Sequence, residues 1–292
     1  MSSYVISCCS TADLTEEHFS KREISYICFH YKLNDTEYAD DLGKSMPFDQ
    51  FYAAMAAGAS TKTSQVNADE FEAYFETFLQ DGKDILHVCL SSGISGVLNS
   101  AMIAKADLEE RYPERKILIV DSLGASSGYG LLMDRLADLR DEGKPLEEVY
   151  DFAMKNRLKV HHWFFSTDLT FYVRGGRISK SLAFAGTMLQ IKPVLAVTDG
   201  EIQLLGKARG SKMGNNLLAQ EIQKAGGVDF SRPVLLGYTG LSDALLQKYI
   251  EDSRWLWADH AETLRYTTIG SVIGTHAGPG AVAVSFFKQD RP

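Results

Sequence analysis

The sequence predicts an α/β fold of two domains, the first built on a doubly wound parallel sheet and the second on a mixed sheet. Segments with strand and helix periodicity alternate along the 292 residues. Residues 85–90 and 116–121 are continuous apolar runs with polar tips, typical of parallel strands covered on both faces. Asp199-Gly200 lies between two apolar runs and suits a type I′ turn, which adds an antiparallel hairpin.

The first half is expected to alternate strands with helices. Asn67 and Glu70 have the spacing of a capping box and start a helix that runs to residue 79. Pro145 is tolerated in the first turn of a helix over 145–158. The other expected strands are at 4–7 and 24–33, and the other expected helices are at 48–57, at 95–110 and from after residue 125 to about 140.

The second half begins where a charged helix gives way to an aromatic strand, near residue 160. We place a boundary there, dividing a domain over 1–160 from a domain over 161–292. Expected strands are at 163–166, 193–198, 201–205, 234–238, 262–266 and 281–287, and expected helices are at 182–190, 212–225 and 243–253.

The composition is that of a soluble globular protein, with 45% hydrophobic and 23% charged residues. A net charge of −8 argues against nucleic-acid binding, which needs a basic face. No apolar run is long enough for a bilayer and no signal peptide is visible, so we expect a cytoplasmic protein without membrane insertion. The histidines lack metal-ligand spacing and no phosphate-binding glycine motif occurs, so we expect no metal and no cofactor. Reduced core thiols are expected at Cys8, Cys9, Cys28 and Cys89.

The segment SSGISG at 91–96 places hydroxyls and glycines where a buried strand turns into a helix. Free backbone N–H groups and the positive end of the helix dipole favour an anion there. The loop TKTSQ at 61–65 precedes another helix at the same predicted sheet edge. The hydroxyls of Thr63 and Ser95 could therefore converge on a carboxylate, although helix entry alone also explains 61–65.

A third loop, GTHAGPG at 274–280, surrounds His276 with three glycines and a proline. Glycine allows close backbone approach, so His276 is the best candidate for a donor to a carboxylate, although a lone histidine is more often structural. Ser64, Ser92 and Gly278 are candidates for supporting positions around this site.

A basic segment stands out in this acidic chain. Between residues 174 and 212 there are seven Lys or Arg against two acids, Asp199 and Glu201. A solvated charged face explains this, and so does a surface for an anion or an acidic partner. The candidates for such a surface, or for one that meets an acyl phosphate, are Arg174, Arg177, Lys207 and Arg209.

These segments together resemble the DegV family of bacterial lipid-binding proteins. The resemblance extends from the CSTADL segment at 9–14 through 63–65, 91–96, 120–122, 174–179, 191–195 and 207–210 to the loop at 274–280. It implies a two-domain α/β protein that holds one long-chain fatty acid between its domains. Thr63 and Ser95 match the hydroxyls that bind the carboxylate in the family, and His276 matches the histidine beside that head group.

The resemblance also implies a partner, because some members of the family are the acyl-binding subunit of fatty acid kinase. A separate ATP-binding subunit then phosphorylates the bound carboxylate, and this chain is not itself an enzyme. Apolar lining for the acyl tail is expected from residues 164–165, 171–172, 182–185 and 188–189.

Two other functions remain open on the sequence alone. Ser95 with His276 could serve a hydrolase or transferase, with Asp121 as the acid that orients the histidine. A lipid buffer or transporter without any kinase partner is the other alternative.

Overall fold

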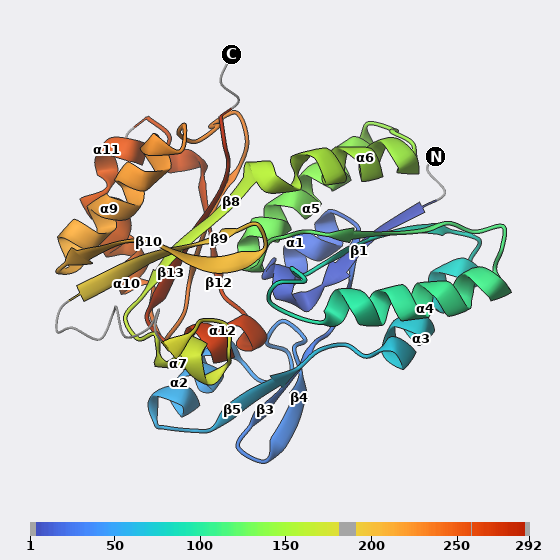
Figure 1. Cartoon of the computed structure of the whole chain (residues 1–292), viewed down its shortest axis with the longest axis horizontal. Helices are drawn as coiled ribbons and strands as arrows, with labels where there is room; N and C mark the ends of the chain where they lie inside the picture. The colour runs from blue at the N-terminus through green and yellow to red at the C-terminus, as the bar shows by residue number, and fades with distance from the viewer. Residues whose placement is uncertain (1–3, 181–190, 258, 290–292) are drawn as a thin grey trace.

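The computed structural model describes residues 4–180, 191–257 and 259–289 and has an α/β architecture with two principal sheets (Figure 1). A four-stranded sheet of order β2-β1-β6-β7 is parallel throughout, as predicted for the first half. Its strands are β1 (Tyr4–Cys9), β2 (Ile24–Ile27), β6 (Asp84–Cys89) and β7 (Ile117–Asp121).

Helices cover both faces of this parallel sheet (Figure 1). On one side are α3 (Ala68–Gln80) and α4 (Val97–Arg111), and on the other are α5 (Ser126–Asp141) and α6 (Leu146–Asn156), with α1 (Glu16–Lys21) beside β2. The capping box is confirmed: Asn67 Oδ1 accepts from Glu70 N, and Glu70 Oε2 accepts from Asn67 N. The helix expected from residue 95 begins two residues later, at Val97.

A six-stranded mixed sheet of order β10-β9-β8-β13-β11-β12 is built by the second half. Only β11 and β12 pair in parallel among its described strands, so the predicted fold class is confirmed. Asp199 and Gly200 have φ of 50° and 87°, as the predicted hairpin turn requires. The strands are β8 (Val160–Ser166), β9 (Ile191–Thr198), β10 (Glu201–Arg209), β11 (Val234–Tyr238), β12 (Leu264–Thr268) and β13 (Ala281–Phe287).

The two faces of this mixed sheet differ. One packs on α9 (Ser211–Lys224), α10 (Ala244–Asp252) and α11 (Arg254–Trp257) through a closed apolar core. The short helices α7 (Thr170–Arg174) and α12 (Ser271–Ala277) lie against each other near the other face. The helix expected at 182–190 falls outside the described residues. The domain boundary near 160 stays a prediction; the parallel sheet is built before that residue and the mixed sheet after it.

A small antiparallel sheet, β4-β3-β5, corrects two predictions. Residues 24–33 do not form one strand, because the chain leaves the parallel sheet after Ile27 and starts β3 (His30–Leu33). Residues 61–65 are not a loop, because Thr61–Ser64 forms β5 along β3. The remaining elements of this region are β4 (Thr36–Ala39) and α2 (Phe48–Ala56).

The segment carrying His276 also differs from its prediction as a loop. Residues 271–277 form α12, and the loop is confined to the turn after it, where Gly278 has a φ of 70°. Glycine, threonine and histidine are weak helix formers, so this helix depends on its tertiary contacts. Three short 3-10 turns, Ser10–Ala12, Arg157–Lys159 and Ala261–Thr263, complete the described elements.

Candidate functional site

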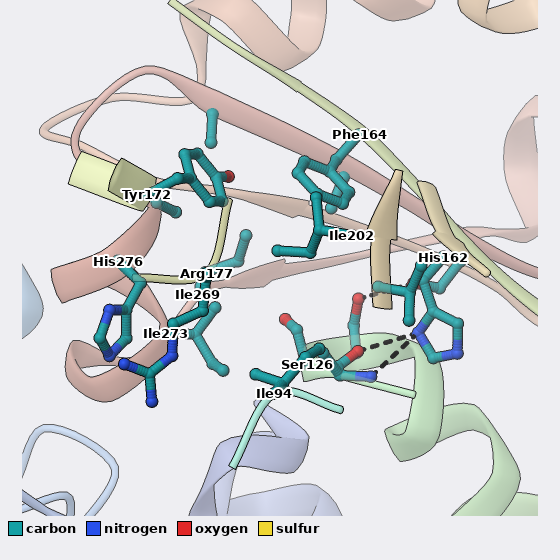
Figure 2. A pocket seen from close by; sticks show the side chains of 17 residues that line it. Ile94, Ser126, His162, Phe164, Tyr172, Arg177, Ile202, Ile269, Ile273 and His276 are labelled. Carbon is teal, nitrogen blue, oxygen red and sulfur yellow. Dashed lines mark hydrogen bonds between the residues drawn. The ribbon is translucent and has the colours of Figure 1, made fainter. Parts of the chain in front are cut away.

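An apolar cavity opens between the mixed sheet and the helices α5, α7 and α12 (Figure 2). The space between its atoms, counted together with open solvent at the mouth, is about 670 Å³. Aliphatic and aromatic side chains make most of its wall, among them Ile94, Phe164, Tyr172, Ile202, Ile269 and Ile273.

Polar groups gather at one end of the cavity, around His276. Its Nε2 lies 2.8 Å from Thr63 Oγ1, so the last turn of α12 meets the edge strand β5. Burial lowers the pKa of His276 to about 4, and the nearby Arg177 guanidinium adds to the shift. The imidazole is therefore neutral at pH 7, and Nδ1 is buried without a hydrogen-bond partner among the described residues.

Gly175 allows this arrangement. A Cβ at position 175 would lie 2.1 Å from His276 Nδ1, so only a glycine lets α7 pack this closely against the ring. The basic, glycine-broken segment noted in the sequence is thus part of the polar end of the cavity.

Arg177 lies beside His276 at this end (Figure 2), in the cavity wall. Its Nη1 donates to Gly175 O, while Nε is buried and has no partner within the described part of the chain. Burial lowers the pKa of Arg177, which nevertheless stays a cation. A cation with an unused donor at the end of an apolar cavity suits an anion.

Ser95 contacts Gln65, which directly follows the strand that carries Thr63. Its Oγ donates to Gln65 Oε1 at 3.3 Å and accepts from Val97 N at 3.3 Å. Ile94, next to it, lines the cavity. The structure therefore brings Thr63 and His276 into contact, and it places Ser95 on the loop before α4, where its hydroxyl contacts Gln65.

The three supporting candidates have separate environments. Ser64 is exposed at the end of β5. Ser92 is also exposed and bonds to Asp121. Gly278 ends α12, where a Cβ would lie 2.3 Å from the Phe171 ring.

The other basic candidates lie outside the cavity lining. Arg174, Lys207 and Arg209 are exposed, and Arg174 stacks 5.3 Å from the Phe171 ring centroid. Lys207 and Arg209 are on β10, the edge strand of the mixed sheet. The four residues grouped in the sequence thus divide into Arg177 in the cavity and three cations on the surface.

The lining agrees with the sequence expectation only in part. Phe164 and Tyr172 line the cavity, whereas Phe165 points into the opposite core and Phe171 packs on Gly278. Residues 182–185 and 188–189 are outside the described residues. The sequence analysis did not identify Ile202, Ile269 and Ile273 as lining residues. It also missed the alternate residues of β13 that face the cavity, although the period-two pattern of 281–287 indicates them.

The far end of the cavity, opposite His276, is bounded by α5 and His162 (Figure 2). His162 Nδ1 lies 2.9 Å from Ala125 O, and burial lowers the pKa of His162 to about 4. A Cβ at Gly128 would overlap this ring, at 1.5 Å from Nδ1. The wall here is completed by Ser127 and Ser285, whose hydroxyls are 2.9 Å apart. No motif in the sequence pointed to these residues.

The geometry does not assemble a catalytic triad from the residues considered for a hydrolase. Within the described part of the chain, His276 contacts the hydroxyl of Thr63, and the Ser95 hydroxyl donates to the side-chain amide of Gln65. Asp121 accepts from Ser92 and Leu123.

Within the same ranges, no helix combines the length and apolarity needed to cross a membrane.

Comparisons with known proteins agree on one family. The sequence pattern described as "Uncharacterised protein, DegV family" matches residues 6–289. A DegV domain-containing protein of Clostridium perfringens is 33% identical over 299 residues, which cover 100% of this chain and 99% of the relative.

Two solved structures illustrate the same fold. The fatty acid kinase B3 protein of Streptococcus pneumoniae, loaded with linoleic acid, has a TM-score of 0.84 and 24% identity, covering 99% of this chain and 100% of its own. A stearic acid-binding protein of Eubacterium ventriosum has a TM-score of 0.84 and 22% identity, covering 98% of each chain.

Proposed function

This chain belongs to the DegV family, and from that premise we propose that it binds one long-chain fatty acid in the cavity that ends at His276. The carboxylate is held at the polar end by Thr63, which His276 orients, with Ser95 alongside, and the acyl tail extends toward α5. The single observation that carries the proposal is an apolar cavity with a neutral imidazole, a hydroxyl and a cation at one end.

The tail supplies the affinity. Each buried methylene contributes roughly 0.8 kcal/mol, so about fourteen of them give on the order of 11 kcal/mol before the costs of binding. The largely aliphatic and aromatic wall suits such a chain and offers few partners to a polar ligand.

The head group needs donors, because a buried carboxylate without partners costs several kcal/mol. The unpartnered Nδ1 of His276 is near the Arg177 cation, which favours a lone pair there and places the proton on Nε2. Nε2–H then donates to Thr63 Oγ1, and the Thr63 hydroxyl proton is free to donate to the carboxylate. Arg177 supplies the opposite charge.

The bound acid is then presented to a separate kinase subunit in the cytoplasm, and this chain performs no chemistry itself. A structural neighbour whose name is fatty acid kinase B3 protein supports this step. The exposed cations Arg174, Lys207 and Arg209 are the proposed surface for that ATP-binding partner or for the acyl phosphate.

Native mass spectrometry of the protein purified from a bacterium tests the binding step. We expect a co-purified long-chain fatty acid, and delipidated protein should rebind one equivalent of linoleic or stearic acid. Protein that carries no lipid and rebinds none contradicts the proposal.

Charge reversal tests the partner step. Arg209→Glu should weaken ATP-dependent phosphorylation of the bound acid by an added kinase subunit and leave fatty-acid affinity at the wild-type value. Loss of both together would overturn the assignment of Arg209.

A further inference from the structure

Two buried carboxyl groups lie at the N-terminus of α12, the helix whose last turn carries His276. Asp13 and Asp40 are 4% and 2% exposed. Asp13 follows the turn at the end of β1 and Asp40 follows β4, so both come from the first half of the chain. Neither belongs to the cavity or to the head-group site.

Asp13 joins α12 to two other elements. Its Oδ1 accepts from Gly270 N at 2.9 Å, and Oδ2 accepts from the hydroxyl of Ser126 at the start of α5. Its backbone carbonyl accepts from Thr267 Oγ1 at 2.8 Å. A Cβ at Gly270 would lie 2.7 Å from Asp13 Oδ1, so the fit is close.

Asp40 lies at the same end of the helix. A Cβ at Gly270 would lie 3.5 Å from Asp40 Oδ1, and the backbone N–H groups of Ser271 and Val272 favour the charged form of its carboxyl group, which lowers its pKa. Ser10 Oγ donates to Asp40 Oδ2 at 2.8 Å, which fixes the carboxyl from the other side.

The N–H groups at 270–272 thus face carboxyl groups from outside the helix, and that of Gly270 donates to Asp13. The first N–H groups of any helix lack partners within it, and a seven-residue helix is not stable on its own. The place of α12 therefore depends on what holds its ends. One end is held by Asp13 and Asp40, and the other brings His276 to Thr63.

We propose that Asp13 and Asp40 are positioning residues, which hold the N-terminus of α12 so that His276 meets Thr63 and, given the proposed function, so that the fatty-acid carboxylate is bound tightly. They act through the helix and do not touch the ligand. The Tyr52 hydroxyl, which donates to Ile269 O at 2.7 Å and packs against Gly274, supports the same helix from the side.

The protonation of Asp13 and Asp40 is expected to affect how they hold the helix. Burial raises the pKa of Asp40 to about 6 and that of Asp13 well above its usual value. We expect this helix cap to weaken below pH 6, because a protonated carboxyl group has one acceptor oxygen fewer for the N–H groups of the helix. The titratable groups that face the pair are Glu16, Cys28, Tyr31, Asp41, Tyr52 and, from α5, Tyr129.

Alanine and asparagine variants test the proposal by two readouts. Asp40→Ala should weaken fatty-acid binding about tenfold, as expected for a lost helix cap, and Asp40→Asn, which keeps one acceptor oxygen, should fall between it and the wild type. In ligand-free protein with ¹⁵N-labelled histidine, the His276 signals of Asp40→Ala should move toward those of Thr63→Val. Asp13→Ala and Asp13→Asn should behave in the same way.

The matched control is Asp134→Asn, which alters another buried carboxyl, held by His18 and Arg22 and without a hydrogen bond to α12 among the described residues. It should lower thermal stability without changing the His276 signals or the affinity. If Asp40→Ala does not fold, the wild-type protein gives the answer: its His276 signals should shift as the pH falls through about 6, and those of Asp40→Asn should not.

Wild-type His276 signals and wild-type affinity in the variants of both residues would overturn the proposal. A wild-type protein that binds no fatty acid would overturn the proposed function instead, and the His276 signals of the ligand-free variants would still decide the role of the two carboxyl groups.

Discussion

His276 and Thr63 lie 213 residues apart in the sequence and 2.8 Å apart in the structure. The contact joins a helix packed near the mixed sheet to an edge strand of the small sheet, at the polar end of the cavity where His276 lies. In the proposed function, Nε2 of the neutral imidazole carries the proton and donates to Thr63, so the Thr63 hydroxyl proton is the one available to the ligand.

Replacing Thr63 by valine should therefore affect both binding and stability. The change keeps the shape and removes the hydroxyl, so His276 Nε2 loses its partner, at a cost of about 1–3 kcal/mol in the free energy of unfolding. Fatty-acid affinity, measured by titration of delipidated protein, should fall at least about tenfold. Thr63→Ser keeps the hydroxyl and should bind nearly as the wild type does; equal affinity in Thr63→Val would contradict the assigned role.

Gly175→Ala should damage the same site from the opposite side of the ring. The new Cβ would lie 2.1 Å from His276 Nδ1, so the ring must move away from Thr63 or the α7 backbone must shift. We expect a loss of affinity of about tenfold or more, together with 1–3 kcal/mol of destabilisation from overpacking. Gly206→Ala is the control, because its Cβ would meet only the flexible tip of Leu217 at 3.1 Å. Unchanged binding in Gly175→Ala would show that the His276 ring accommodates the new Cβ without leaving Thr63, contrary to the role assigned to Gly175.

Much of this fold follows from local sequence signals. The capping box of Asn67 and Glu70, the apolar strand β6 and the Asp199-Gly200 hairpin depend on neighbours a few residues away, and the structure contains all three. The candidates Thr63 and His276 could be singled out from their glycine and hydroxyl surroundings and from the family resemblance. Their contact could not be derived from local pattern, because it depends on how distant elements pack.

The elements that sequence reasoning missed depend on distant partners. The helix at residues 271–277 has Asp13 and Asp40 at its N-terminus, where Asp13 accepts from Gly270 N, and neither carboxyl group is near it in sequence. Residues 61–64 form a strand because β3 lies beside them. The His162 ring fits at the far end of the cavity because Gly124 and Gly128 have no side chains to occupy that space. No spacing of residues in the sequence predicts this contact.

Ala283→Phe should change which fatty acids bind. Ala283 is on β13 and lines the cavity, whereas its neighbours Val282 and Val284 point into the opposite core. A phenyl ring there occupies space meant for the tail, so long acids should lose affinity relative to shorter ones in a competition measured by mass spectrometry. Val284→Ile enlarges the other face of the same strand and should alter stability without altering chain-length preference. An unchanged preference in Ala283→Phe would place the tail elsewhere.

The stability of the protein should fall as the pH is lowered from 6.5 toward 4. Burial lowers the pKa of His87 to about 3 and those of His161, His162 and His276 to about 4. In this window the unfolded chain binds protons that the folded protein excludes, so lowering the pH favours unfolding. Asp13 and Asp40 act in the opposite sense because burial raises their pKa values, but four imidazoles outnumber two carboxyl groups. The net effect on the free energy of unfolding is on the order of 2 kcal/mol per pH unit near pH 5.

Urea unfolding at pH 7, 6 and 5 measures this slope, and Asp40→Asn should steepen the fall by removing an opposing group. A free energy of unfolding that stayed level or rose toward pH 5 would mean that these histidines are charged in the folded protein.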